Sequence, residues 1–491
     1  MYSRAIRRLA YLAFGSGALT LGSLQAVPWA LETYNSRRAT SRQLMDAPLK
    51  SREEQLASLA NQNGPEFDVL IIGGGATGCG CALDAVSRGL KNGAIRYLQK
   101  AVFNLDYEQY RMVKEALGER ANMLHIAPHL TKPLPIMLPI YHLWQLPYYW
   151  VGIKMYDLVS DTQAVFLSEQ VPALEYFPML NKNALKGALV YYDGQQEDAR
   201  MCLSLGLTAA KLGASVANYC EVHSLLKSVD PATGKEVLTG ARVVDNMTGK
   251  EFTVRAKCIV NATGPYTDSV RLMDSPSKPG IVAPSAGVHI SLPDYYSPEM
   301  MGLLDPATAD GRVIFFLPWQ NCTIAGTTDT PCTVSDSPHP AEEDVKFILQ
   351  EIKHYLSPEI VIRRGDVLSR LVLSLNNHSR RKWTTYRQMS EEAIDTAIEV
   401  AGLQPKGPCR TSGLMLLGAY NWSPNLFIRL VQEFGVEPTV AKHLSCLYGD
   451  KCLDLIRLEP LSGHRWPVVG KTAASKLSVF GIGGDFNFWL F

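Results

Sequence analysis

A glycine-rich turn at residues 73–78 is the first feature whose residue types and spacing could do chemistry. It follows the apolar run Phe67–Ile72, which predicts a buried parallel strand, and it precedes small residues in a helical pattern. In this arrangement Gly73 permits the tight turn, Gly75 lets the backbone approach a pyrophosphate, and Gly78 lets helix and strand pack closely. The amides and dipole of a helix N-terminus favour phosphate. The pattern predicts a nucleotide cofactor, although similar turns also occur without ligands.

The chain beyond this helix lacks an acid that such sites ordinarily use. A second strand normally ends in Asp or Glu about 20 residues further on, where it holds the ribose. Here Lys91 is followed by residues 92–95 (NGAI), and the next acid, Asp106, lies inside an expected helix. We therefore expect hardly any room for a second strand and no acid at its end, which leaves the cofactor site half built.

A second turn of small residues, NATGP at 261–265, follows the strand-like residues 258–260. Because Gly264 has no side chain, it allows the backbone to approach a bound cofactor closely. On its own, this segment is equally consistent with a plain turn. Together with the first turn, it favours a flavin.

Charge and cysteine content exclude several classes of site. The 48 basic and 47 acidic residues nearly cancel, which gives no electrostatic reason to expect a nucleic-acid partner. The ten cysteines are scattered, with no Cys-x-x-Cys pair and no zinc spacing. We expect buried thiols rather than disulfides, no metal and no redox dithiol.

The N-terminal segment has the composition of a targeting sequence. Arg4, Arg7 and Arg8 precede the uncharged residues 9–31, and the first acid is Glu32. An arginine-rich, acid-poor start predicts mitochondrial import. The uncharged stretch is also long enough to span a bilayer, which leaves open whether it is cleaved or stays as an anchor. A secretory signal is the alternative, disfavoured because no disulfide framework follows.

Longer stretches carry a family resemblance. They include FDVLIIGGGATGCGCALDAVSRGLK, LPYYWVGIKMYDLV, RAKCIVNATGPYTDSVR and YYSPEMMGLLDPATADGRVIFFLPW. From about residue 67 to 467 the chain resembles the mitochondrial FAD-dependent glycerol-3-phosphate dehydrogenases. The resemblance implies an α/β fold with a Rossmann-type FAD-binding domain, an inserted antiparallel substrate domain and a helical C-terminal domain. On this basis we expect targeting segment and linker at 1–62, the interleaved FAD and substrate domains at 63–400, and a truncated helical domain at 401–491.

The resemblance also implies a reaction and its partners. Members oxidise sn-glycerol 3-phosphate to dihydroxyacetone phosphate with FAD and pass the electrons to ubiquinone, at the outer face of the mitochondrial inner membrane. A homodimer is left open. An FAD oxidoreductase of the amine or amino-acid oxidase type is the alternative enzyme.

Individual positions can be carried over where the motifs match. His289 is similar in position to the histidine that serves as base for the C2 hydroxyl, a role that imidazole suits near neutral pH. Arg96, Tyr97 and Lys382 match substrate-site residues, of which the two cations would hold the phosphate. The positions that match FAD contacts are Gly73, Gly74, Gly75, Thr77, Gly78, Asn261, Thr263 and Gly264.

The chain departs from the family pattern in three places. About two dozen family residues between Lys91 and Arg96 are absent, including the second strand with its Glu and a serine-rich flavin loop. A family segment before Lys382 is shortened as well. The last residues, GGDFNFWLF, lack the spaced acids of the family's calcium-binding EF-hands. We therefore expect weak FAD binding, slow turnover and no activation by calcium, and the alternative is a catalytically silent homologue or splice product.

Overall fold

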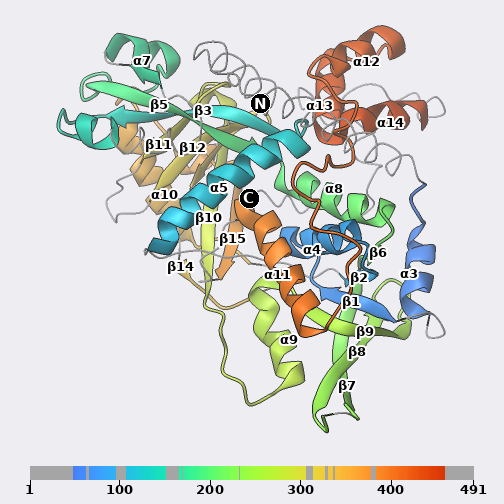
Figure 1. The fold of residues 1–491 in the computed structure, drawn as a ribbon. Helices are drawn as coiled ribbons and strands as arrows, with labels where there is room; N and C mark the ends of the chain where they lie inside the picture. Colours follow the sequence, from blue (N-terminus) through green and yellow to red (C-terminus); the bar gives the residue numbers. More distant parts are fainter. Residues whose placement is uncertain are drawn as a thin grey trace, which may run out of the picture.

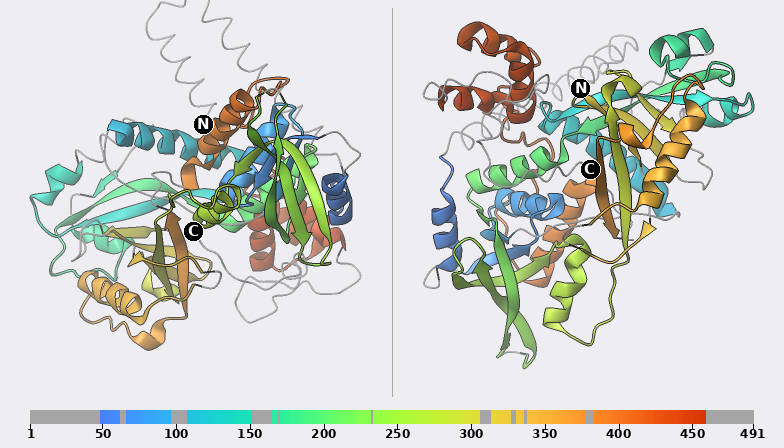
Figure 2. Two further views of the ribbon diagram at one scale, coloured as in Figure 1. Left: turned by 90° about the horizontal axis from the view of Figure 1, so that it is seen from below. Right: turned by 180° about the vertical axis from the view of Figure 1, so that it is seen from behind.

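The computed structural model describes residues 48–61, 66–95, 107–150, 165–167, 170–231, 233–305, 313–326, 330–335, 338–377 and 383–458. Two β-sheets lie side by side, and a group of helices near the C-terminus lies beyond the helices that cover the first sheet (Figures 1 and 2). Of the expected targeting segment and linker, 1–62, residues 1–47 and 62 lie outside the described residues, whereas residues 52–60 form a helix with Leu59 buried against the first sheet.

The first sheet is the Rossmann-type layer. Its strand order is β6-β2-β1-β9-β8-β7, in which β6, β2, β1 and β9 run parallel and β7 and β8 are antiparallel. The strands are β1 (Phe67–Ile72), β2 (Asn92–Ile95), β6 (Ser215–Ala217), β7 (Cys220–Val229), β8 (Glu236–Asp245) and β9 (Glu251–Asn261).

Apart from Asp68, the residues of strand β1 are apolar, because other elements cover both of its faces. Val69 and Ile71 pack into a core formed with α4 (Ala76–Ser87), α8 (Asp198–Lys211), α5 (Tyr107–Ile126) and α11 (Tyr386–Val400). Leu70 and Ile72 face the opposite way, into a core with Leu59 of α3 (Arg52–Ala60) and Val270 of α9 (Thr267–Asp274). This two-sided burial is what the consecutive apolar residues 69–72 predict.

The expectation that a second strand is missing is wrong. Strand β2 lies between β1 and β6, with Val69 opposite Asn92 and Gly93 opposite Ser215. Four residues are enough because backbone amides and carbonyls alone make the ladder. The Asn92 side chain anchors the strand, since its amide donates to the Ala82 carbonyl oxygen over 2.7 Å. Neighbouring strands are therefore paired, although no acid follows the strand before Asp106.

The second sheet is largely antiparallel. Its order is β14-β10-β13-β12-β11-β3-β5-β4, and β15 also pairs with β10. Helix α10 (Glu342–Tyr355) contributes apolar side chains to the core on this sheet. The strands are β3 (Thr131–Ile140), β4 (Val165–Leu167), β5 (Gly187–Gln196), β10 (Pro284–Pro293), β11 (Gly302–Asp305), β12 (Ile314–Trp319), β13 (Cys322–Gly326), β14 (Thr330–Pro331) and β15 (Ser369–Asn377).

Three helices near the C-terminus form a separate small core. They are α12 (Leu426–Phe434), α13 (Pro438–Tyr448) and α14 (Cys452–Leu458). Helix α8 is joined to them by Arg200, whose Nε donates to the Leu447 carbonyl oxygen over 3.1 Å. Parallel sheet, antiparallel sheet and C-terminal helices confirm the predicted fold class. None of the helices in the described part of the chain has the length and hydropathy of a membrane span.

Candidate active site

The glycine turn at residues 73–78 connects β1 to α4 and depends on two glycines. Gly73 has a φ of 122°, and a Cβ there would lie 2.2 Å from the Ala262 carbonyl oxygen. A Cβ on Gly78 would lie 1.8 Å from the Gly73 carbonyl oxygen. No side chain can be accommodated at either position, because both overlaps are with backbone atoms. The turn therefore packs tightly against the backbone that follows β9, and the first residues of α4 pack tightly against the turn.

Gly75 differs from these two glycines because space lies in front of it. A Cβ built on Gly75 would meet no other atom within 4 Å. The residue is also the N-cap of α4, so no side chain caps the first amides of this helix. Uncapped amides facing open space fit an anionic group such as a pyrophosphate. The residues present therefore fit the phosphate part of a dinucleotide cofactor.

The second turn continues β9 beside the first. The Ala262 amide donates to the Ile72 carbonyl oxygen over 2.7 Å, which aligns the two strand ends. The Thr263 hydroxyl, almost fully buried, donates to the Asn261 side-chain oxygen over 2.6 Å. Gly264 then turns the chain with a φ of 55°. The structure thus brings together all eight predicted FAD-contacting residues at the ends of two adjacent strands.

Helix α11 packs on the first turn of α4, which sequence reasoning did not anticipate. The Ser390 hydroxyl donates to the Thr77 carbonyl oxygen over 3.0 Å. A Cβ on Gly80 would lie 2.3 Å from the Ser390 hydroxyl oxygen, so the small residues after the motif permit this close packing. The glycine turn is consequently supported by a helix from the far end of the oxidoreductase region.

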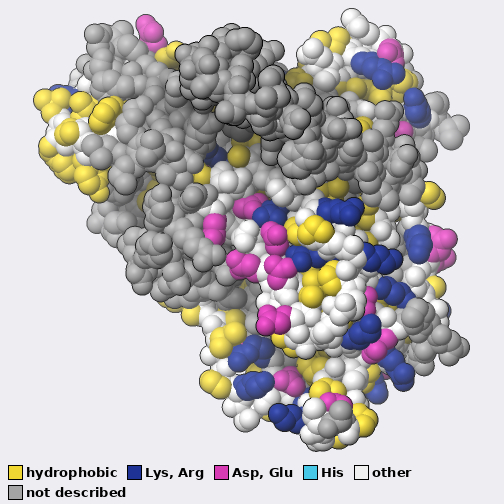
Figure 3. All heavy atoms as spheres, viewed as in Figure 1, with side chains coloured by type: hydrophobic (Ala, Val, Ile, Leu, Met, Phe, Trp, Pro, Cys, Tyr) yellow, Lys and Arg dark blue, Asp and Glu magenta, His cyan; other side chains and the backbone are white. Residues whose placement is uncertain are grey.

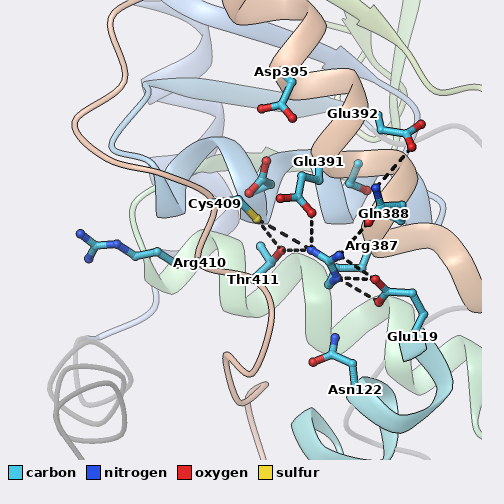
Figure 4. Close-up of polar contacts among 12 residues, drawn as sticks. Glu119, Asn122, Arg387, Gln388, Glu391, Glu392, Asp395, Cys409, Arg410 and Thr411 are labelled. Carbon is cyan, nitrogen blue, oxygen red and sulfur yellow. Dashed lines mark hydrogen bonds and ion pairs between the residues drawn. The ribbon is translucent and has the colours of Figure 1, made fainter. Parts of the chain in front are cut away.

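A buried ion-pair network fixes the start of α11 (Figure 4). Arg387 donates through Nε to both carboxylate oxygens of Glu119 on α5, over 2.8 and 2.9 Å, and through Nη1 to Glu391 over 2.7 Å. The same guanidinium reaches the Thr411 hydroxyl, 3.4 Å away. Burial alone would lower the pKa of Arg387, but its hydrogen bonds to Glu119 and Glu391 outweigh this and raise it. Nothing in the spacing of these residues reveals the network, because Glu119 and Arg387 lie far apart in sequence.

His289 is on the antiparallel sheet, in the middle of β10. It lies opposite Gly326 on one side and Leu371 on the other. A Cβ on Gly326 would lie 2.6 Å from the imidazole Cδ2, so the ring occupies the space over this glycine. The neighbouring strand β15 contacts the helical turn η1 (Gly264–Tyr266). The histidine is therefore one strand away from the element that carries Gly264. Arg96, Tyr97 and Lys382 lie outside the described residues.

Comparisons with known proteins agree with this geometry. Residues 68–393 match the FAD dependent oxidoreductase family, and residues 409–478 match the C-terminal domain of alpha-glycerophosphate oxidase. The mitochondrial glycerol-3-phosphate dehydrogenase of Mesocricetus auratus is 52% identical in an alignment of 530 residue positions, gaps included. The alignment covers 97% of this chain and 72% of that protein. The Mus musculus protein of the same name is 55% identical over 477 residues, 87% of this chain and 65% of its own length.

A solved structure is similar as well. It is the glycerol-3-phosphate dehydrogenase from Bacillus halodurans complexed with FAD, with 28% identity and a TM-score of 0.65. The likeness covers 83% of this chain and 79% of that one. With a matching family over most of its length and relatives above 50% identity, this chain belongs to the mitochondrial FAD-dependent glycerol-3-phosphate dehydrogenase family.

Proposed function

We propose that the chain oxidises sn-glycerol 3-phosphate to dihydroxyacetone phosphate with FAD as cofactor. The observation that carries the proposal is the open space before Gly75, at the uncapped N-terminus of α4 and beside the turn at 261–264. The matched names supply the substrate, since the relatives are glycerol-3-phosphate dehydrogenases. When bound, FAD supplies the acceptor for the hydride that leaves C2 of the substrate.

The protein residues have three remaining roles, which are cofactor binding, substrate binding and proton transfer. Gly73, Gly75 and Gly78 hold the loop that receives the pyrophosphate, and Gly264 brings the second turn close to the flavin. A ring nitrogen of His289 accepts the proton of the C2 hydroxyl. We assign Arg96 and Lys382 to the substrate phosphate, which they would bind with charge-assisted hydrogen bonds, and Tyr97 to the same substrate site. These roles follow from the matched motifs.

A purified protein tests the proposal through two separate readings. Flavin absorbance per mole of protein reports cofactor binding, and a dye-linked assay with glycerol 3-phosphate reports turnover. We expect His289→Asn to keep the flavin content of the parent protein and to lose most of its turnover, on the order of 100-fold or more, because general acid–base catalysis contributes that much. Unchanged turnover in this variant would remove His289 from the mechanism.

A catalytically silent homologue is the second candidate, and one observation favours it. No acid occurs between β2 and Asp106, so the usual ribose contact is lacking from the sequence. If this candidate is right, the parent protein shows no turnover even when it is saturated with FAD. Measurable turnover that depends on His289 excludes it.

We propose that electrons pass to ubiquinone at the mitochondrial inner membrane, on its outer face. An exposed apolar surface at the end of β3 supports membrane contact (Figure 3). This aromatic patch consists of Leu143, Trp144, Tyr148 and Trp150, whose exposed fractions are 73%, 67%, 70% and 48%. Leu146 and Tyr149 of the same segment pack into a small core, which anchors the segment and leaves the four patch side chains exposed. Aromatic side chains of this kind favour the membrane–water interface.

A further inference from the structure

Two cysteines converge on the carbonyl of Gly74, in the middle of the cofactor loop. Cys79 on α4 and Cys202 on α8 have their Sγ atoms 3.4 and 3.3 Å from the Gly74 carbonyl oxygen. The two sulfurs are 3.9 Å apart, and both residues are reduced in the structure. Sequence spacing predicted no redox dithiol. The fold assembles a close pair of thiols from two helices.

The surroundings distinguish this pair from Cys81, the other thiol on α4. Cys79 is buried, whereas Cys202 is half-buried and so is the more exposed residue of the pair. Helices α4 and α8 approach closely, since a Cβ on Gly206 would lie only 3.4 Å from the Cys79 sulfur. Cys81, two residues along α4, is fully buried, and this burial raises the pKa of its thiol to about 12. Burial therefore disfavours the reactive thiolate form of Cys81.

We propose that Cys79 and Cys202 form a disulfide when the protein meets a peroxide. One thiolate attacks hydrogen peroxide and becomes a sulfenic acid, releasing hydroxide, which takes up the proton lost by that thiol. The second sulfur then displaces the sulfenic hydroxyl, which leaves as water with the second proton. Two thiols and one peroxide thus yield one disulfide and two waters. The two electrons go from the sulfurs to the peroxide oxygens.

The disulfide between Cys79 and Cys202 changes the hydrogen bonding of Gly74 in the glycine turn at residues 73–78. A disulfide has its sulfurs about 2.05 Å apart, so the present pair must close by roughly 1.9 Å, which pulls α4 and α8 together. Oxidation also removes both S–H donors from the Gly74 carbonyl oxygen. Gly74 lies between the glycine that closes the turn and the glycine that faces the open space. The loop therefore loosens on oxidation, and FAD is released faster. This second step rests on the proposed cofactor site, whereas the disulfide does not.

Peptide mapping of the full chain tests the disulfide. The protein is treated with hydrogen peroxide, alkylated, digested without reductant and analysed by mass spectrometry. We expect a peptide pair joined through Cys79 and Cys202 that disappears with dithiothreitol and is absent from Cys202→Ser. Oxidation of the exposed Cys446 shows that the oxidant has acted. Modified Cys446 without the joined pair would overturn the proposal.

Hydrogen exchange of residues 73–80 tests the effect on the loop, with FAD release measured beside it. Serine at position 202 keeps a donor for Gly74 but cannot form the bond, so Cys202→Ser is the matched control. We expect severalfold faster exchange and FAD release in the oxidised parent, both reversed by dithiothreitol, and no response in the variant. A joined pair with unchanged exchange would overturn the loop step. Protein without FAD would contradict the proposed function and leave both the mapping and the exchange readable.

Discussion

The guanidinium of Arg387 lies against the carboxylate of Glu119, with its Nε within 2.9 Å of both carboxylate oxygens. Both side chains are about nine-tenths buried. This ion pair joins α5 to the first turn of α11, which in turn packs on the glycine turn through Ser390. The contact therefore links the stability of the protein to the position of its cofactor loop.

Glu119→Gln should destabilise the protein strongly. The substitution keeps the shape of the side chain but leaves the buried guanidinium without its main counter-charge, at a cost of about 3 kcal/mol. Thermal unfolding followed by circular dichroism measures the effect. The double variant Glu119→Gln with Arg387→Met should recover part of the loss, because no buried guanidinium is left without its counter-charge, and Glu391, which also loses Arg387, is partly exposed to solvent. A single variant that unfolds like the parent would contradict the importance of this pair.

Gly73→Ala and Gly75→Ala should both lose FAD for different reasons. Alanine at position 73 overlaps a backbone carbonyl at a φ of 122°, so this variant should also melt at a lower temperature. Alanine at position 75 has an ordinary φ of −71° and fills only the open space, so it should melt like the parent. Flavin absorbance after gel filtration and thermal melting separate the two.

Gly118→Ala is the matched control for these glycine variants. Gly118 lies in α5, and a Cβ there would also meet nothing within 4 Å. Alanine should stabilise the helix by about 0.5–1 kcal/mol and leave the flavin content unchanged. Full flavin content in Gly75→Ala would show that the pyrophosphate does not occupy the space before this residue.

The free energy of unfolding should decrease as the pH is lowered, because His129 is buried in its neutral form. Burial, with a smaller effect of Arg200, lowers the pKa of His129 to about 3. An unfolded histidine has a pKa near 6.5, so between about pH 6.5 and 3 only the unfolded chain binds the proton. This contribution is complete above pH 6.5 and declines as the pH falls. From pH 6.5 to 5 it should cost about 2 kcal/mol.

Denaturant unfolding of the parent and of His129→Asn at pH 7 and pH 5 checks this prediction. The variant has no titrating imidazole at position 129, so its loss of stability over the interval should be smaller by about 2 kcal/mol. His443, whose pKa burial also lowers, remains in both proteins and contributes equally. Equal losses in the two proteins would show that His129 takes up its proton in the folded state.

Removal of the aromatic patch should weaken binding to lipid vesicles. Trp144→Ser with Tyr148→Ser removes two exposed rings, each worth about 1–2 kcal/mol at an apolar surface. We expect at least tenfold weaker cosedimentation with vesicles of phosphatidylcholine and cardiolipin. The protein is prepared without residues 1–47, so that only the patch is tested. The control is Ile428→Ser, which replaces an exposed apolar side chain on α12. This variant should bind the vesicles like the parent protein.

The sequence predicted those features that depend on local chemistry. Gly73 is predicted to permit the tight turn and Gly78 to let helix and strand pack closely, and the φ of 122° at Gly73 and the overlap at Gly78 agree with this. Gly75 is predicted to let the backbone approach a pyrophosphate, and the space before this residue leaves room for one. The second strand was missed because strand pairing uses backbone groups, which residues 92–95 supply without any side-chain signature. The pair of Glu119 with Arg387 joins segments far apart in the chain, so no spacing rule reveals it.

The pairing of β1 with β9 determines when the cofactor site is completed during synthesis. The loop that begins at Gly73 closes against Ala262, and α11 supports it only from residue 386 onward. A nascent chain that has just released β1 and β2 from the ribosome has the glycines but neither of these supports. The supported cofactor loop therefore exists only once most of the polypeptide has emerged from the ribosome. A complete site for FAD therefore requires residues up to α11, so we expect the segments before it to begin folding without support from the cofactor.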